Sequence, residues 1–207
     1  MGSHYQAEQL VFVDETGSNR KTTSCTHGWA PTGDQACRRD FFVQGMKYLV
    51  LPALSIDGIV HADIQAATYT ANTFNTFIEA LLLCMNPFPG PCSVLIMDNA
   101  SIHKSERLEE ICAKRYIIPF HSSIDILMLY TCRGVHLIFL PPYSPDFNPI
   151  EEVFSFIKGW LQCNQDHANI ELGAAGIERP KDLLFEAVYS VTPEATRSWF
   201  SHAGCLL

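Results

Sequence analysis

Short apolar runs along the chain end on polar or acidic residues, a pattern that is typical of strands in a mixed sheet. The run "LVFVDETG" is β-branched and apolar up to Asp14, and "SVLIMD" and "VHLIFLPP" have the same character over residues 93–98 and 135–142. We predict a strand at each of these three places. A further apolar stretch, "FFVQGMKYLVLPALSIDGIVHADI", contains Asp57-Gly58, a pair that favours a hairpin turn.

Helices are predicted where apolar residues recur at helical spacing. In residues 73–84 they form one face, with Thr73 available as the N-cap. A second helix opens at Asn148-Pro149, which combines a cap residue with a proline suited to the first helical position. Its apolar face consists of Ile150, Val153, Phe154, Ile157, Trp160 and Leu161. Another helix is predicted over residues 105–114.

Strands and helices alternate along the chain, which predicts a mixed α/β domain. With 207 residues, of which 47% are hydrophobic and 17% charged, the chain can bury one sizeable core, and we expect a single domain over residues 1–207. No apolar run approaches the roughly 20 residues of a membrane span, and the N-terminus lacks the pattern of a secretory signal. We therefore expect a soluble, intracellular protein without a membrane partner.

The formal charge of -8 argues against a general coat for nucleic acid, because lysine and arginine drive phosphate binding. The charge is uneven, however: residues 20–47 hold five lysine and arginine residues against two aspartates. A local basic face and an ordinary solvated loop are both compatible with this segment. The eight cysteines show no close spacing of a zinc or redox motif, so we expect reduced, mostly buried thiols.

Acidic residues follow two of the predicted strands and open a predicted helix. Asp14 and Asp98 stand at strand ends, and Glu151 and Glu152 lie in a first helical turn, where periodicity barely separates them. Each alone has an ordinary explanation as a turn residue or a partner of the helix dipole. If the two strands are neighbours, their carboxylates repel by about 4 kcal/mol at roughly 4 Å and an effective dielectric of about 20. A divalent cation would remove this repulsion, and oxygen-only ligands favour Mg²⁺ or Mn²⁺ over zinc.

The motifs "FVDETG", "GWAPTGD", "IMDNASIHKS" and "LPPYSPDFNPIE" follow one another within residues 10–161. In this order they resemble the successive motifs of the mariner superfamily of DDE transposases. The resemblance implies a ribonuclease H-like fold, a mixed sheet flanked by helices, with a metal-dependent acidic triad that cuts and joins DNA. Carried over to this chain, the triad is Asp14, Asp98 and Glu151, which hold two divalent cations, Mg²⁺ or Mn²⁺.

Other residues of the motifs have less defined roles. Asn99 and His103 are candidates to support the site, and His103 could orient a phosphate or the second aspartate, or only cap a loop. Glu15 should point away from the preceding aspartate if the strand continues. The C-terminal "TRSWFSHAGC" resembles the family's terminal helix, in which Trp199 and Phe200 are expected to close the core. The residues that bind DNA remain unassigned.

Two features depart from the family pattern. Only thirteen residues precede Asp14, too few for the helix-turn-helix region with which such transposases find their transposon ends. We therefore expect an isolated catalytic domain without sequence-specific binding. Residues 116–132 resemble an insertion between a helix and a strand of the family pattern, either a translated intron or an added strand or hairpin.

The function that the resemblance implies is that of a metal-dependent DNA endonuclease and strand-transfer domain acting in transposition. DNA is the expected partner, the expected location is the nucleus, and whether the chain forms a homodimer is left open. An alternative is a catalytically inactive transposase remnant that acts, if at all, as a protein-interaction domain. A ribonuclease that cuts RNA–DNA hybrids would share the fold and the metal chemistry but not the "SPDFNPIE" motif.

Overall fold

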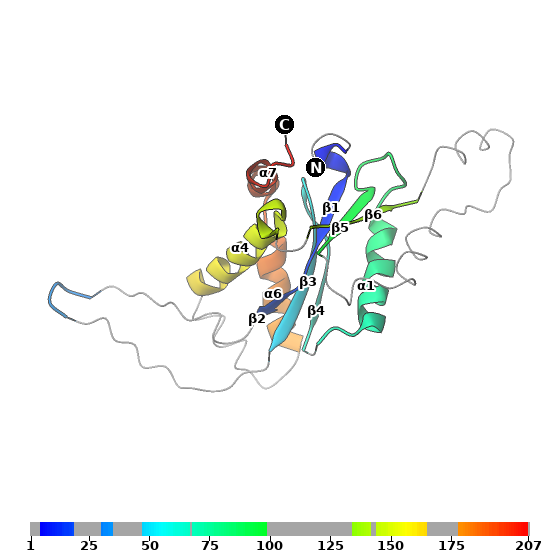
Figure 1. Cartoon of the computed structure of the whole chain (residues 1–207). Coiled ribbons are helices and arrows are strands. Elements are labelled where there is room, and N and C mark those ends of the chain that lie inside the picture. The colour runs from blue at the N-terminus through cyan, green and yellow to red at the C-terminus, as the bar shows by residue number, and fades with distance from the viewer. Residues whose placement is uncertain are drawn as a thin grey trace, which may run out of the picture.

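The computed structural model describes residues 5–18, 30–34, 47–66, 68–98, 134–141, 144–164 and 178–206. Within these ranges the chain forms one mixed sheet of six strands with helices on both faces (Figure 1). The strands are β1 (Leu10–Val13), β2 (Thr16–Ser18), β3 (Tyr48–Ser55), β4 (Gly58–Gln65), β5 (Val94–Met97) and β6 (His136–Phe139). The predicted mixed sheet flanked by helices is thus confirmed.

The described helices include the two predicted near residues 73–84 and after Asn148-Pro149, and also α6 (Glu178–Tyr189), which the hydrophobic pattern did not predict. They are the short 3-10 helix η1 (Ala7–Gln9), then α1 (Ala71–Cys84), the 3-10 helix η4 (Pro145–Phe147), α4 (Ile150–Cys163), α6 (Glu178–Tyr189) and α7 (Pro193–His202). Among the described residues, no helix has both the length and the apolar character that crossing a membrane requires.

The pairing of the strands places three of their carboxyl ends at one edge of the sheet. Strand β5 runs parallel to β1 on one side and to β6 on the other, with Met97 opposite both Val13 and Phe139. Strand β3 runs antiparallel to β1, β2 and β4. Strands β1 and β2 pair with β3 one after the other, so the chain leaves the ladder only briefly between Val13 and Thr16.

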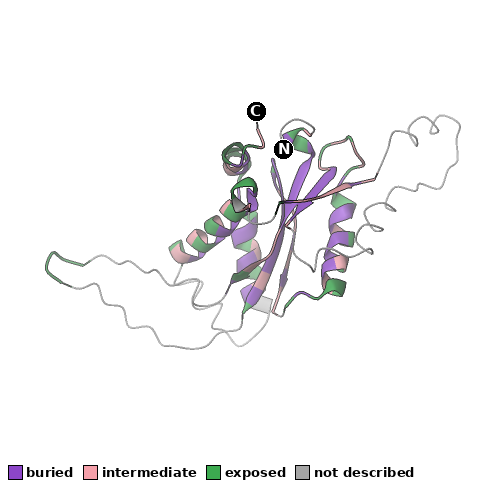
Figure 2. Cartoon of the chain, viewed as in Figure 1, coloured by how far each residue is buried: buried purple, intermediate pink, exposed green. Residues whose placement is uncertain are grey.

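Alternate residues of the central strands pack against helices on opposite sides, as the period of two along a strand requires. Val11 and Leu95 pack in one cluster with the apolar face of α1. Phe12 and Ile96 pack in the other cluster with α4, α6 and α7. Both clusters are buried in the interior between the sheet and its helices (Figure 2). The parity of each strand residue therefore tells which helix layer it faces.

Helix α1 has the predicted apolar face but begins earlier than predicted. Its buried residues are Phe74, Phe77, Ile78, Leu81 and Leu82. The predicted cap, Thr73, was wrong. Thr70 is the N-cap, and its hydroxyl accepts from Thr73 N. Thr73 completes the capping box by accepting from Thr70 N through its own hydroxyl. Either threonine fits a cap from sequence alone, and the tertiary path of the chain selects Thr70.

Helix α4 begins at Ile150, one residue later than predicted, and Pro149 precedes it with helical backbone angles. The side-chain oxygen of Asn148 accepts from Ile150 N at 3.4 Å, so this asparagine still satisfies a backbone donor of the first turn as a cap does. The buried face consists of Ile150, Val153, Phe154, Ile157 and Leu161, with Trp160 partly buried at its margin. The first turn therefore points its two glutamates away from this face.

The C-terminal residues close the core as predicted. Phe200 of α7 is fully buried, and its ring meets that of Phe12 edge to face with centroids 5.5 Å apart. Trp199 is only partly buried and packs against Phe156 of α4, with the ring centroids 5.9 Å apart. Helix α7 thereby joins the first strand to α4.

The hairpin between β3 and β4 turns where the sequence predicts it. Ser55 pairs with Gly58, which leaves Ile56 and Asp57 as the turn. Gly58 has a φ of 126°, a backbone conformation that other residues rarely adopt.

The prediction of mostly buried thiols was wrong for the four cysteines that the structure describes. All four are free of disulfides, but Cys84 and Cys163 are exposed, and Cys92 and Cys205 are only half-buried. Cys84 and Cys163 end their helices, where the apolar face no longer covers the side chain.

Several sequence predictions concern residues outside the described ranges. These are the helix over residues 105–114, the insertion over 116–132, the supporting residues Asn99 and His103, and most of the basic segment 20–47.

Candidate active site

Asp14 and Asp98 each follow directly on one of two paired parallel strands. Val13 and Met97 are register partners, so the next residues, Asp14 and Asp98, leave the sheet side by side at its carboxyl edge. Adjacent strands in a sheet lie about 4.8 Å apart. Both aspartates also continue the parity of Phe12 and Ile96, the residues that pack beneath α4. The two carboxylates therefore belong to the same face of the same edge.

The start of α4 brings the third acid to this edge. Asn148, immediately before the helix, donates from Nδ2 to Asp14 Oδ2 at 3.2 Å, across 134 positions of sequence. Glu151 lies in the first turn of α4 and is exposed, so its carboxylate is available at the surface. This hydrogen bond thus ties Asp14 to the start of the helix that carries Glu151.

The pKa of Asp14 reflects its burial first and the neighbouring acids second. The pKa of its carboxyl is raised from the ordinary value of 3.8 to about 7, and burial is the main cause. The backbone N–H of Glu15 donates to Asp14 Oδ1 at 2.8 Å and opposes this rise. The negative charges of Asp98, Glu151 and Glu15 each add to it. Asp98 and Glu151 therefore lie within electrostatic range of Asp14.

The contacts of α4 also separate the two glutamates that periodicity left ambiguous. Glu152 Oε1 lies 3.1 Å from Nδ1 of His202, so this side chain turns toward the end of α7. Glu151, and not Glu152, is among the charges that raise the pKa of Asp14. The geometry therefore favours Glu151 as the acid that faces the strand ends.

Glu15 belongs to the opposite side of the edge. Burial and the hydrogen bond to Asp63 are the main causes of the raised pKa of Tyr69, a buried residue of the cluster beneath α1, and the charge of Glu15 adds to them. This position agrees with the alternation of side chains beyond Val13. Glu15 contributes negative charge near Asp14, but it faces the other helix layer.

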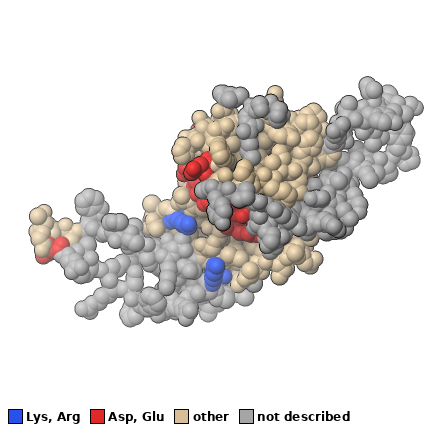
Figure 3. All heavy atoms as spheres, in the orientation of Figure 1, with Lys and Arg blue, Asp and Glu red and all other residues tan. Residues whose placement is uncertain are grey.

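The chemistry of this edge suits a hard divalent cation. Its candidate ligands are carboxylate oxygens, the donors that Mg²⁺ and Mn²⁺ prefer. Figure 3 shows acidic side chains near the middle of one face, with coloured basic side chains below them on the same face. Within the described ranges, no three His, Cys, Asp or Glu side chains are grouped closely enough to constitute a metal site. The chemical type of these ligands thus fits the expected ions, but the described carboxylates lie farther apart than the ligands of a bound metal ion would.

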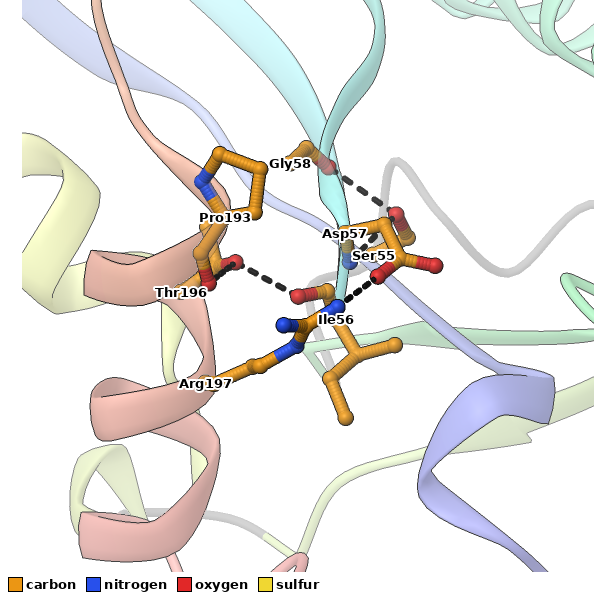
Figure 4. A network of polar contacts seen from close by, with 7 residues as sticks. All are labelled: Ser55, Ile56, Asp57, Gly58, Pro193, Thr196 and Arg197. Atoms are coloured by element: carbon orange, nitrogen blue, oxygen red, sulfur yellow. Dashed lines mark hydrogen bonds and ion pairs between the residues drawn. The ribbon is translucent and has the colours of Figure 1, made fainter.

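An acid elsewhere in the chain is neutralised in a different way. Asp57 lies in the β3–β4 turn, and its Oδ1 is 2.8 Å from the Nη2 of Arg197 on α7 (Figure 4). Beside this ion pair, the hydroxyl of Thr196 donates to the carbonyl of Ile56 at 2.6 Å. The turn lies toward the amino end of β1, because the last β1–β3 pair before it joins Phe12 to Leu54. Here the guanidinium of Arg197 provides the positive charge that pairs with the carboxylate of Asp57.

Sequence reasoning missed Asn148 as a residue of the site. The asparagine was explained by its role as a helix cap, which the structure confirms, but its amide also donates to Asp14. An amide carries a donor and an acceptor, whereas a cap uses only the acceptor. That spare donor, at the start of the helix that carries Glu151, was the available signal.

Several solved structures with a similar fold are those of the Mos1 mariner transposase. The Mos1 mariner paired-end complex with Mn matches with a TM-score of 0.60 at 13% identity, covering 94% of this chain and 52% of that one. The Mos1 strand transfer complex matches with 0.57 at 16%, covering 94% and 51%. The Mos1 catalytic domain with raltegravir and Mg matches with 0.54 at 14%, covering 94% and 78%. The chain thus spans about half the length of the transposases in the first two structures.

These likenesses confirm the ribonuclease H-like fold that the sequence motifs imply. No protein with a curated description is significantly similar in sequence. The family model described as the DDE superfamily endonuclease matches residues 9–172, which include all three predicted triad residues. The chain therefore belongs to the DDE superfamily endonuclease family.

Proposed function

We propose that this chain is the catalytic domain of a mariner-type transposase, which cuts and joins DNA with the help of two divalent cations, Mg²⁺ or Mn²⁺. The observation that carries the proposal is the register of β1 and β5, which sets Asp14 beside Asp98 while the start of α4 brings Glu151 into their electrostatic range. The order of the sequence motifs and the family membership support it.

In this proposal the three acids divide the work by their positions. Asp14 and Asp98 leave a rigid, paired sheet edge, so they offer oxygen ligands from fixed points. Glu151 stands on the first turn of α4 and would complete the second ion site. When bound, two such ions stabilise the attacking and leaving oxygens of an in-line displacement at phosphorus. The nucleophile is water in DNA cleavage and a DNA 3′-hydroxyl in strand transfer.

DNA is the partner in this proposal, and the nucleus is the location. Mos1 is seen in paired-end and strand transfer complexes, and structures of its catalytic domain contain Mn or Mg. The acidic balance of this chain predicts weak DNA binding without sequence preference, because few cations are available to displace the counterions of the phosphates. The proposal leaves open whether the chain acts as a homodimer.

A thermal melt with added Mn²⁺ tests the metal dependence. A ligand that binds only the folded state stabilises it by about 2.7 kcal/mol at 100 times its Kd. We expect Mn²⁺ to raise the Tm of the wild-type chain and to raise that of Asp98→Asn much less, because the mutant lacks one of the repelling charges that the cation offsets. Glu8→Gln, an exposed acid before the amino end of β1, is the control and should respond like the wild type.

An equal rise in Tm for the wild type and Asp98→Asn would remove the metal site at this edge. That result would favour the inactive remnant, in which the fold survives as a protein-interaction domain. A rise that depends on Asp98, followed by Mn²⁺-dependent nicking of duplex DNA, would support the transposase chemistry.

A further inference from the structure

Asn148 holds the first aspartate and the catalytic helix together through separate atoms of one side chain. Its Nδ2 donates to Asp14 Oδ2 at 3.2 Å, and its Oδ1 accepts from Ile150 N at 3.4 Å. Its backbone carbonyl also accepts from Glu151 N at 3.2 Å. The residue is only 6% exposed, so these bonds are made out of water. One buried residue therefore contacts the strand end and the first turn that carry two triad acids.

The bonds to Asp14 come from two directions. Glu15 N donates to Oδ1 at 2.8 Å from the strand itself, while Asn148 donates to Oδ2 from the helix. With a donor on each oxygen, the plane of the carboxylate cannot rotate freely about its Cβ–Cγ bond. The lone pairs that these donors leave unused then have a fixed direction.

Capping alone does not require an asparagine at this position. Serine, threonine and aspartate serve about as well as N-caps, because the cap needs only an oxygen acceptor. Among these residues, asparagine alone also carries an N–H donor that is suited to a carboxylate. Both parts of the amide are used here, and the donor part is directed at Asp14.

We propose that Asn148 is a positioning residue that fixes the Asp14 carboxylate relative to Glu151, so that both present oxygens to the same divalent cations. The inference rests on the proposed function, since it assigns a role in the same metal site. Partners that hydrogen-bond a metal ligand orient it, and their loss typically weakens metal binding by 10- to 100-fold.

The variant Asn148→Ser separates positioning from capping. Serine keeps a cap oxygen for the first turn of α4, but it has no amide to reach Asp14. We expect Mn²⁺, titrated by calorimetry and by the loss of its free-ion electron paramagnetic resonance signal, to bind Asn148→Ser about tenfold more weakly than the wild type. The fold is checked in parallel by thermal melting. If Asn148→Ser does not fold, Asn148→Thr offers the same comparison.

The matched control removes a cap far from the site. Thr192 caps α7 by accepting from Ala195 N at 3.4 Å. Thr192→Ala should lower the Tm by the loss of a cap and leave the Mn²⁺ affinity unchanged. If the role of Asn148 were merely structural, Asn148→Ser would likewise leave the Mn²⁺ affinity unchanged.

The outcomes distinguish the inference from the function on which it rests. If the wild type binds Mn²⁺ through Asp98 and Asn148→Ser binds it equally well, the positioning role is refuted and the proposed function stands. If the wild type itself binds no Mn²⁺, the proposed function fails and the inference fails with it. Weaker binding by Asn148→Ser, together with unchanged binding by Thr192→Ala, supports the inference.

Discussion

Asp14 and Asp57 are both aspartates at the end of a strand, but the chain surrounds them differently. Asp57, 70% exposed in its side chain, pairs with Arg197 on α7. Asp14 is half-buried, and the charged neighbours that affect its ionisation are other acids. The charge of Asp57 is neutralised by a residue of the chain itself. Around Asp14, by contrast, negative charges gather where burial makes them costly. An unfavourable group that a fold maintains in this way is expected where a ligand offsets the cost.

The largest expected effect follows from the charge of Asp14. Its pKa is about 7 in the folded state and 3.8 ordinarily, so the protonated form contributes stability that is fully present below pH 3.8 and is lost as pH rises through 7. Asp14→Asn removes this loss. In metal-free buffer we expect the variant to gain stability over the wild type between pH 4 and pH 8, by up to about 4 kcal/mol.

Denaturant unfolding of both proteins at several pH values measures this difference. If the difference in unfolding free energy between Asp14→Asn and the wild type stays constant from pH 4 to pH 8, the charge of Asp14 is not destabilising and the comparison with Asp57 fails. Asp57→Asn is the control, because its carboxylate is exposed and paired with an arginine.

A smaller effect is expected at the other region, where stability and metal binding should be separable. Thr196 is fully buried and donates to the carbonyl of Ile56 at 2.6 Å (Figure 4). Thr196→Val keeps the shape but leaves that carbonyl without its donor, which costs about 1–3 kcal/mol. We expect a lower free energy of unfolding and an unchanged Mn²⁺ affinity. A loss of Mn²⁺ binding in this variant would show that the two regions are coupled.

The smallest effect is expected for the exposed ion pair itself. Arg197 and Asp57 are 58% and 70% exposed, and such pairs contribute about 0.2–1 kcal/mol. Arg197→Gln should therefore lower stability by less than about 1 kcal/mol, and the loss should shrink at high salt because ions screen the pair. A chemical denaturation series at low and high salt checks both statements. A loss of several kcal/mol would mean that the pair anchors α7.

Local pattern predicted the elements of this fold well, because side-chain alternation and helical spacing are local properties. The apolar faces of α1 and α4 follow the predicted residues, and the strand ending at Asp14 ends where the acid interrupts the apolar run. The cap of α1 was misplaced since Thr70 and Thr73 satisfy each other's backbone, and only the path of the preceding chain distinguishes them.

The site required information that no local pattern holds. That β1 lies parallel to β5, and so sets Asp14 beside Asp98, is a property of the whole sheet, and the sequence supplied it only through the family resemblance. The choice between Glu151 and Glu152 likewise became physical only when His202, fifty positions away, was seen to engage Glu152. Asn148 was overlooked because one sufficient role, the cap, concealed the second.

Anomalous X-ray scattering from crystals soaked in Mn²⁺ tests most directly whether the acidic edge holds divalent cations. The proposal predicts a manganese peak between the carboxylates of Asp14 and Asp98, a second peak beside Glu151, and the loss of both in Asp98→Asn. A wild-type crystal whose manganese lies elsewhere, for example at Glu152 and His202, or that shows no manganese at this edge, would contradict it.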